Sequence, residues 1–406
     1  MRATAARQGT LREHNLELVL RHVLDASTVG ARPPSRADVA AATGLTRATV
    51  SALVDRLVQA GLVEELPPAP AVRAGRPAVP LAAPSRTFAA LGAEVNVDYL
   101  GARVLDLSGA VLAERQVTGD YRGSDPEAVL HLLARLVDDL VDEVRATAPV
   151  PRLVGSALAL PGLVDRASGS LLLAPNLGWR EVDVAGLLRA SSVLRELPPQ
   201  LGNEADLAAQ AEADARRTHG GAASFFYVSG EVGIGAALVL EGARFDGRHG
   251  WAGEIGHTVV DGSRSLEDVA GQDAMLRAAG LDPHERADRL EEAAAAGEPR
   301  ALAALEAAGR GLGVALANAV NLLDVPDVVL GGVYARLAAY LRGPALQVLR
   351  ERVVAEPWAA PTVQVAVAGE LPAMTGGALT VLERVRRAPA AWLVEETAAA
   401  TATSAP

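Results

Sequence analysis

The chain has 406 residues, 50% of them hydrophobic, and a formal net charge of −11 at pH 7. This length exceeds one ordinary hydrophobic core, so two or three packed units are expected. Because cysteine is absent, disulfides, a thiolate nucleophile and cysteine-ligated metals are excluded. No secretory signal and no run of about 18 apolar residues is recognisable, which predicts a cytoplasmic globular protein without membrane spans.

Charge is distributed unevenly along the chain. Residues 1–86 carry a net charge of +4, and the rest of the chain carries −15. A small basic segment attached to an acidic body indicates that one end contacts a polyanion such as DNA. The alternative is chance variation in a short segment.

Two helices are predicted at the start of the basic segment. Apolar residues at helical spacing between Leu11 and Val23 predict a first helix that ends near Ala26. Ser35 and Asp38 have the spacing of a capping box that begins a second helix, which ends about two turns later at a glycine.

A third helix follows and is the candidate DNA-recognition element. Its predicted N-cap is Thr46, and one apolar stripe consists of Val50, Leu53, Val54 and Leu57. Small, polar and basic side chains remain outside this stripe, which permits close approach to base edges in a major groove. The predicted DNA contacts are Thr46, Arg47, Ala48, Thr49 and Ser51. The alternative is that the three helices merely cap an enzyme.

A wing is predicted after the third helix. "LVEEL" (62–66) has the pattern of its first strand, whereas residues 67–86 contain six prolines and predict a linker or extended arm. Arg73 and Arg76 in this arm are candidates for a narrow A/T-rich minor groove, although an ordinary Arg-Pro linker is the alternative. The predicted domains are a winged helix-turn-helix (1–66), the arm (67–86), a body (87–387) and an alanine-rich tail (388–406).

The body alternates between strand and helix patterns, which predicts an α/β fold with a mixed sheet covered by helices. Ligands in such folds bind near the carboxyl ends of strands. The predicted strands lie in 88–117 (three), 152–162, 224–242 and 326–332, and the predicted helices are 126–146, 301–323 and 334–353.

Six motifs occur in the order and spacing of the ROK family, which comprises repressors, open reading frames and sugar kinases. They are "LPGLVD" (160–165), "PNLGW" (175–179), "GNEADLAAQAEA" (202–213), "YVSGEVGIGAALVLEG" (227–242), "GWAGEIGH" (250–257) and "VVLGG" (328–332). The chain resembles this family over about residues 11–387, including the winged helix-turn-helix of its regulators. The resemblance implies an actin-like, ribonuclease-H-like body of two lobes with a sugar site between them. The implied sugar contacts are Asn203, Glu204, Glu254, His257 and Glu267.

Three departures from the family's kinases argue against phosphoryl transfer. The loop of type Asp-x-Gly-Gly-Thr that holds ATP phosphates contains Glu94, Asn96, Asp98 and Tyr99 here. The second phosphate loop begins with Glu231 and Val232 instead of Gly-Thr, and the catalytic Asp is replaced by Glu204. Carboxylates and bulk repel a triphosphate, and a longer base is mispositioned, so no catalytic residues are expected.

The family's structural zinc site is also altered. In relatives a His and three Cys hold the metal, but this chain has a shortened loop with Ser265 at the last Cys position. A lone His257 cannot hold structural zinc, so no metal and no cofactor are expected. Carboxylates and a neutral imidazole accept hydrogen bonds from hydroxyls, so the segment is predicted to bind a sugar rather than to form only a solvated turn.

The sequence therefore predicts a sugar-responsive transcriptional repressor that binds operator DNA as a homodimer or homotetramer. One alternative is an ATP-dependent sugar kinase with an appended DNA-binding head. Another is a regulator whose body only oligomerises and binds no effector.

Overall fold

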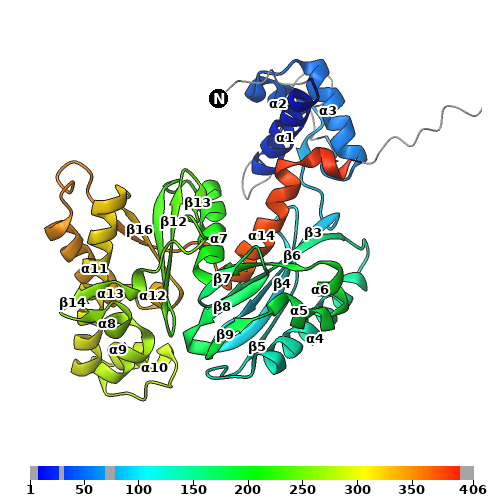
Figure 1. The fold of residues 1–406 in the computed structure, drawn as a ribbon. Coiled ribbons are helices and arrows are strands. Elements are labelled where there is room, and N and C mark those ends of the chain that lie inside the picture. Colours follow the sequence, from blue (N-terminus) through cyan, green and yellow to red (C-terminus); the bar gives the residue numbers. More distant parts are fainter. Residues whose placement is uncertain (1–7, 27–31, 69–77, 394–406) are drawn as a thin grey trace, which may run out of the picture.

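The computed structural model describes residues 8–26, 32–68 and 78–393. It consists of a mostly helical head and a body of two lobes, each built on a five-stranded sheet (Figure 1). Within these ranges, no helix combines the length and the apolar character that a membrane crossing requires. Arg73 and Arg76 lie outside the described residues.

The head has the three helices and the wing that its sequence predicts. Its elements are α1 (Gln8–Ala26), α2 (Arg36–Thr43), α3 (Arg47–Gln59), β1 (Glu64–Glu65) and β2 (Leu81–Ala82). Ser35 and Asp38 form both hydrogen bonds of a capping box, and the Thr46 side chain accepts from the Thr49 amide. The return strand β2 pairs antiparallel with β1, so part of the proline-rich arm belongs to the wing.

The first lobe is a sheet in the order β10-β6-β3-β4-β5. Strand β3 pairs parallel with β6 and antiparallel with β4, which starts a meander to β5. Helix α4 (Pro126–Arg145) covers one face and contributes its buried apolar stripe to a core with β3 and β6. Besides α4, the elements of this lobe are β3 (Phe88–Val95), β4 (Tyr99–Asp106), β5 (Val111–Thr118), β6 (Arg152–Leu160), β7 (Leu163–Asp165), β8 (Ser170–Ala174), η1 (Pro175–Leu177), β9 (Trp179–Val182), α5 (Val184–Leu187), η2 (Leu188–Ala190), α6 (Ser192–Glu196) and β10 (Pro199–Asn203).

The second lobe repeats this topology in the order β13-β12-β11-β16-β17. In both sheets three consecutive strands form an antiparallel meander, and two later strands add in parallel beside the first. The strands are β11 (Phe225–Gly230), β12 (Ile234–Leu240), β13 (Ala243–Phe245), β16 (Asp327–Gly331) and β17 (Thr362–Val365). The lobe also contains η3 (Ile255–His257), the hairpin β14 (Val259–Asp261) and β15 (Arg264–Ser265), α8 (Glu267–Ala270), α9 (Gln272–Ala279), α10 (Ala287–Ala295), α11 (Pro299–Leu323), α12 (Gly332–Arg336) and α13 (Ala338–Arg352).

The segment predicted as a single helix over 334–353 is two helices. Helices α12 and α13 meet at Leu337, whose side chain is fully buried in the core of the second lobe. The change of helix at this point places Leu337 in that core together with residues of both helices. The long helix α11, which the sequence predicts over 301–323, packs against α13.

Helices α7 (Glu204–His219) and α14 (Pro372–Arg387) lie between the two sheets. They pack against each other at very short range, because a Cβ on Gly376 would lie only 1.7 Å from the carbonyl oxygen of Leu207. Within α7, Glu212 is fully buried and pairs with Arg216 at 2.6 Å. The second oxygen of Glu212 accepts the amides of Val367 and Ala368 at 2.8 and 2.9 Å, which ties α7 to the chain after β17.

The end of α14 joins the body to the head. The helix leads into η4 (Pro389–Trp392), and the Trp392 ring meets Phe88 edge-on at 5.9 Å while the Arg152 guanidinium lies 5.0 Å from its centre. Residues 388–393, where the sequence predicts the start of a tail, therefore pack against the core that includes the head.

Candidate functional site

The predicted DNA face of α3 is not used for packing within the head. Thr46, Arg47 and Ala48 are exposed, and Thr49 and Ser51 are half-buried, whereas the four stripe residues are at most 5% exposed. Among the described residues, no group pairs with the Arg47 guanidinium. The N-terminal end of α3 therefore presents hydroxyls and one uncommitted cation to solvent.

Two further arginines lie beside this face. Arg12 from α1 and Arg56 from α3 line a hollow together with Thr49 and Ala52. Their place beside the α3 face could not be predicted from the sequence, because the position of Arg12 depends on how α1 packs against α3. They extend the positive charge next to the predicted contacts of α3.

Asn203 and Glu204 lie where β10 passes into α7. The side chain of Asn203 caps α7 by accepting the Ala205 amide at 2.8 Å, and it donates to the carbonyl of Gly162 at 3.0 Å. Glu204 accepts a hydrogen bond from the Asn96 side chain at 3.3 Å. Both residues are thus fixed at the edge of the first sheet.

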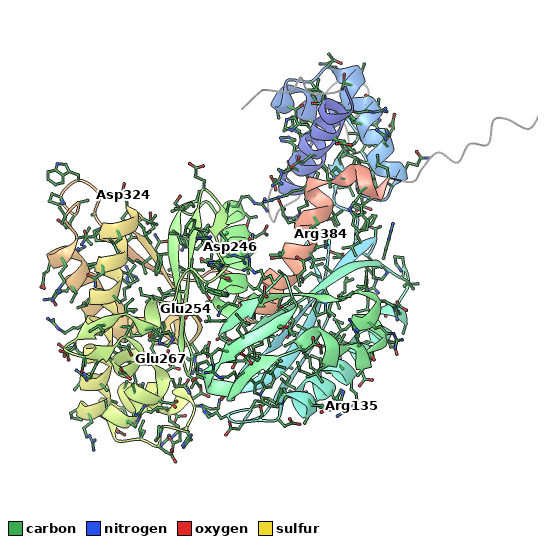
Figure 2. All side chains as sticks on the ribbon, in the orientation of Figure 1. Arg135, Asp246, Glu254, Glu267, Asp324 and Arg384 are labelled. Atoms are coloured by element: carbon green, nitrogen blue, oxygen red, sulfur yellow. The ribbon has the colours of Figure 1, made fainter. Side chains whose placement is uncertain are left out.

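The structure brings Glu254, His257 and Glu267 together on the second lobe; Figure 2 shows the positions of the two glutamates. The His257 Nε2 atom lies 4.0 Å from Glu254 Oε2, and these side chains are 67% and 42% exposed. Burial raises the pKa of Glu254; the charge of Glu267 adds to this shift, and His257 opposes it. Glu267 accepts the Ile234 amide at 3.3 Å and is therefore held in place.

Residues 233–235, at the start of β12, lie close both to Asn203 of the first lobe and to Glu267 of the second lobe. A Cβ on Gly235 would lie 3.9 Å from Asn203 Oδ1, and the preceding residue, Ile234, donates to Glu267. A Cβ on Gly233 would lie 2.8 Å from Asn176 Nδ2 and 3.4 Å from Glu267 Oε2. Asn176 is a further polar neighbour; it was not among the predicted contacts, and its only sequence signal is its place in the motif "PNLGW".

Three carboxyls near this site have raised pKa values. Burial raises the pKa of Glu94 to about 7 and that of Glu231 to about 8, and it raises the pKa of Glu204 well above its ordinary value. The charge of Glu94 adds to the shifts of Glu204 and Glu231, so the three groups interact. Glu94 and Glu231, at the kinase phosphate-loop positions, therefore act electrostatically on Glu204, at the position of the catalytic Asp.

The residues near His257 do not fit structural zinc. In the described part of the chain, no three His, Asp or Glu side chains are placed to hold a metal ion. Ser265, at the position of a Cys in relatives, exchanges hydrogen bonds with Asp268 at the start of α8. This pair stabilises the turn that leads into α8.

Ion pairs connect the head to the helices between the lobes. Arg21 of α1 pairs with Glu383 of α14 at 2.8 Å, and Arg217 of α7 lies 3.2 Å from Asp25 of α1. Burial raises the pKa of Glu383, but hydrogen bonds from Arg21 and Arg387 outweigh it and hold this pKa below its ordinary value. Helix α7 thus extends from Glu204 to a contact with the head. Glu204 belongs to the interlobe site, by which we mean the predicted sugar contacts Asn203, Glu204, Glu254, His257 and Glu267.

The head is a winged helix, and the two lobes of the body have sheets of matching topology. Proteins of this class join a DNA-binding type of domain to a sugar-kinase-like fold. Residues 90–384 match the ROK family, and residues 19–73 match the MarR family. The chain belongs to the ROK family.

Its relatives include named repressors. The xylose repressor of Caldicellulosiruptor bescii is 28% identical over 346 residues, which cover 79% of this chain and 83% of the repressor. The DNA-binding transcriptional dual regulator NagC of Escherichia coli is 28% identical over 322 residues, covering 74% and 77%.

Solved structures share the fold. A ROK family transcriptional regulator, a homolog of the E. coli MLC protein, has a TM-score of 0.73 at 24% identity and covers 93% of this chain and 97% of its own. A ROK family glucokinase from Streptomyces griseus, solved with glucose and AMPPNP, has a TM-score of 0.58 at 20% identity and covers 72% and 98%.

Proposed function

We propose that the protein is a DNA-binding transcriptional regulator, acting as a repressor in the cytoplasm, whose operator affinity is controlled by a sugar or sugar derivative. The observation that carries this proposal is the pairing, in one chain, of an uncommitted α3 face with carboxyl, imidazole and amide side chains on the facing parts of two lobes. The relatives named as repressors support it, and the carboxyls at the phosphate-loop positions disfavour the kinase alternative.

The proposed DNA complex uses two heads of a symmetric oligomer. Each α3 enters a major groove, and Arg73 and Arg76 follow the adjacent minor groove. Two-fold symmetric regulators of this type bind half-sites about 34–36 Å apart, or multiples of that spacing. A homodimer or homotetramer is therefore proposed, with a pseudo-palindromic operator.

Selection of bound fragments from genomic DNA by the purified protein tests this function. We expect a few short sites with two-fold symmetry to be enriched. Binding that depends on salt but not on sequence would contradict the proposal, because it would indicate phosphate contacts alone.

Arg47→Ala is expected to weaken operator binding by about 1 to 3 kcal/mol, which is the usual contribution of a side chain that reads a base edge. Fluorescence anisotropy with a selected operator measures this change. The matched control is Arg189→Ala, which removes an exposed arginine of the body. Unchanged operator affinity in a folded Arg47→Ala variant would exclude α3 from the interface.

Glu383→Ala is expected to reduce the sugar response, because it removes the ion pair between α14 and α1. The measured quantity is the ratio of operator affinities without and with sugar, where a tenfold ratio equals about 1.4 kcal/mol of coupling. Arg387→Ala is the matched control, since it removes the local partner of Glu383, and Arg387 forms no ion pair with the described residues of the head. An equal ratio in both variants would show that this ion pair does not transmit the response.

A further inference from the structure

One arginine of the first lobe bridges to the second lobe. Arg166 lies in the turn between β7 and β8. Its guanidinium pairs with Asp246, directly after β13 of the second lobe, at 3.0 Å. Its other terminal nitrogen pairs with the buried Asp206 of α7 at 2.9 Å. A single side chain thus joins the first lobe, the helix between the sheets and the second lobe.

The bridge is part of an alternating network of charges. Arg244 of β13 pairs with Asp246 at 2.5 Å and donates a hydrogen bond to the backbone carbonyl of Asp206 at 3.3 Å. Burial raises the pKa of Asp206 to about 6, and the charges of Arg244 and Arg166 oppose this shift. The buried carboxyl is therefore compensated by one arginine from each lobe. Such compensation is lost when the lobes separate.

A second contact between the lobes lies beside this network. The indole N–H of Trp251 donates to the backbone carbonyl of Val164 in β7 at 3.1 Å. The His249 ring stacks on this indole at 5.1 Å. Trp251 belongs to the segment that leads to Glu254. The ion pair of Arg166 and the Trp251 hydrogen bond thus hold the β7–β8 hairpin against the chain that carries a predicted sugar contact.

The network also faces the junction with the head. Arg244 and Asp246 line a hollow that is shared with Arg21 of α1 and Glu383 of α14. Arg21 and Glu383 form the ion pair between the head and the body. A movement of the second lobe that breaks the bridge therefore also moves two residues that line this hollow.

We propose that Arg166 is a positioning residue that fastens the two lobes in their close arrangement and thereby sets the sugar concentration that releases the operator. The inference rests on the proposed function and specifies how its site is regulated. The interlobe site has predicted sugar contacts at the edge of the first sheet and on the second lobe. A sugar that contacts both favours the same arrangement as the bridge, so loss of the bridge weakens sugar binding without removing a sugar contact.

The sign of the effect on the operator follows from linkage. A sugar releases DNA only when sugar and operator favour different arrangements of the protein. The bridge favours the sugar-bound arrangement and therefore opposes operator binding. Without sugar, a variant that lacks the bridge is expected to bind the operator at least as tightly as the wild type. With sugar, its release requires a higher concentration but reaches the same limit at saturation.

The separation of the lobes can be measured without any sugar. The natural chain contains no cysteine, so dyes can be attached to Arg195→Cys in α6 and Glu306→Cys in α11, both exposed positions. Arg166→Ala is expected to lower the energy transfer between them. Arg115→Ala is the matched control, because its ion pairs lie within the first lobe. Equal transfer in the two variants would overturn the proposal.

Asp246→Ala tests the same bridge from the second lobe. Asp246 is partly exposed, and this variant leaves the pair of Arg166 and Asp206 in place, so it does not depend on how a buried carboxyl tolerates the loss of Arg166. It is expected to lower the transfer as Arg166→Ala does. The double variant should show no further fall, because both changes remove one interaction. A fall equal to the sum of the two would show that they act independently and would contradict the bridge.

Titration of operator complexes with neutral, amino and phosphorylated hexoses and pentoses tests the regulatory part. For each sugar that releases the wild type, Arg166→Ala is expected to need about five to ten times more sugar. An unchanged midpoint, a smaller response at saturation, or weaker operator binding without sugar would refute the positioning role. In that case the proposed function still stands, because the wild type responds. If no sugar alters operator binding by the wild type, the proposed function fails, and the energy-transfer comparison alone decides whether the bridge fastens the lobes.

Discussion

Glu254→Ala is expected to bind the operator as the wild type does and to remain bound at sugar concentrations that release the wild type. Glu254 is 42% exposed beside His257, so its removal costs ligand contacts rather than packing. Loss of one charged hydrogen-bond partner weakens sugar binding by about 1.5 to 3 kcal/mol. His257→Ala should act in the same direction, because its side chain is 67% exposed.

Gel-shift titration of these variants with the inducing sugar measures the response. Asp261→Ala is the matched control, since Asp261 is an exposed carboxylate of the β14–β15 hairpin that pairs with Arg264. It should respond normally. Release of Glu254→Ala at the wild-type sugar concentration would show that Glu254 does not bind the sugar. Loss of DNA binding without sugar would show that its role is structural.

Glu212→Ala is expected to lower the free energy of unfolding by about 3 to 5 kcal/mol, the cost of removing one partner of a buried ion pair. Glu212 is fully buried, and its loss leaves the guanidinium of Arg216 without its carboxylate. The variant also leaves the amides of Val367 and Ala368 without their acceptor. Urea denaturation followed by circular dichroism measures the change.

Glu143→Ala is the matched control for this effect. Glu143 pairs with Arg115 on the surface and is 59% exposed, so the expected loss is below about 1 kcal/mol. A loss in Glu212→Ala that is no larger than in Glu143→Ala would mean that α7 is not anchored through Glu212.

The head could be predicted almost entirely from local sequence signals. The capping pair of Ser35 and Asp38, the cap at Thr46 and the apolar stripe of α3 each specify structure within a few residues, and the structure contains all of them. The exposed face of α3 followed directly from this stripe. The adjacent arginines Arg12 and Arg56 did not, because their proximity arises from packing between helices.

Helices α7 and α14 were not predicted as elements, for a physical reason. Helix α7 is buried on several faces and carries buried Asp206, Glu212 and Arg216, so it lacks an apolar stripe opposite a polar one. Helix α14 contains Gly376 and Gly377, which weaken helix propensity but permit its close contact with α7. The packing that joins the lobes to the head thus runs through the two helices that periodicity does not reveal.

The interlobe site was predicted only in parts. Motifs identified Asn203, Glu204, Glu254, His257 and Glu267 one by one, and they identified Glu94 and Glu231 only as obstacles to ATP. That the charges of these last two raise the pKa of Glu204 depends on how β3, α7 and the β11–β12 turn are brought together by the two sheets. Such convergence between distant segments has no local signature.

The most direct test of the proposed function is a titration of the intact protein with neutral, amino and phosphorylated sugars in the presence of ATP. Operator affinity and ADP release are both measured during this titration. We predict that at least one sugar weakens operator binding tenfold or more, which requires about 1.4 kcal/mol of coupling, and that no sugar-dependent ADP is formed. Sugar-dependent ADP formation that Glu204→Gln abolishes, with operator binding unaffected by every sugar, would contradict a sugar-controlled regulator and establish a kinase.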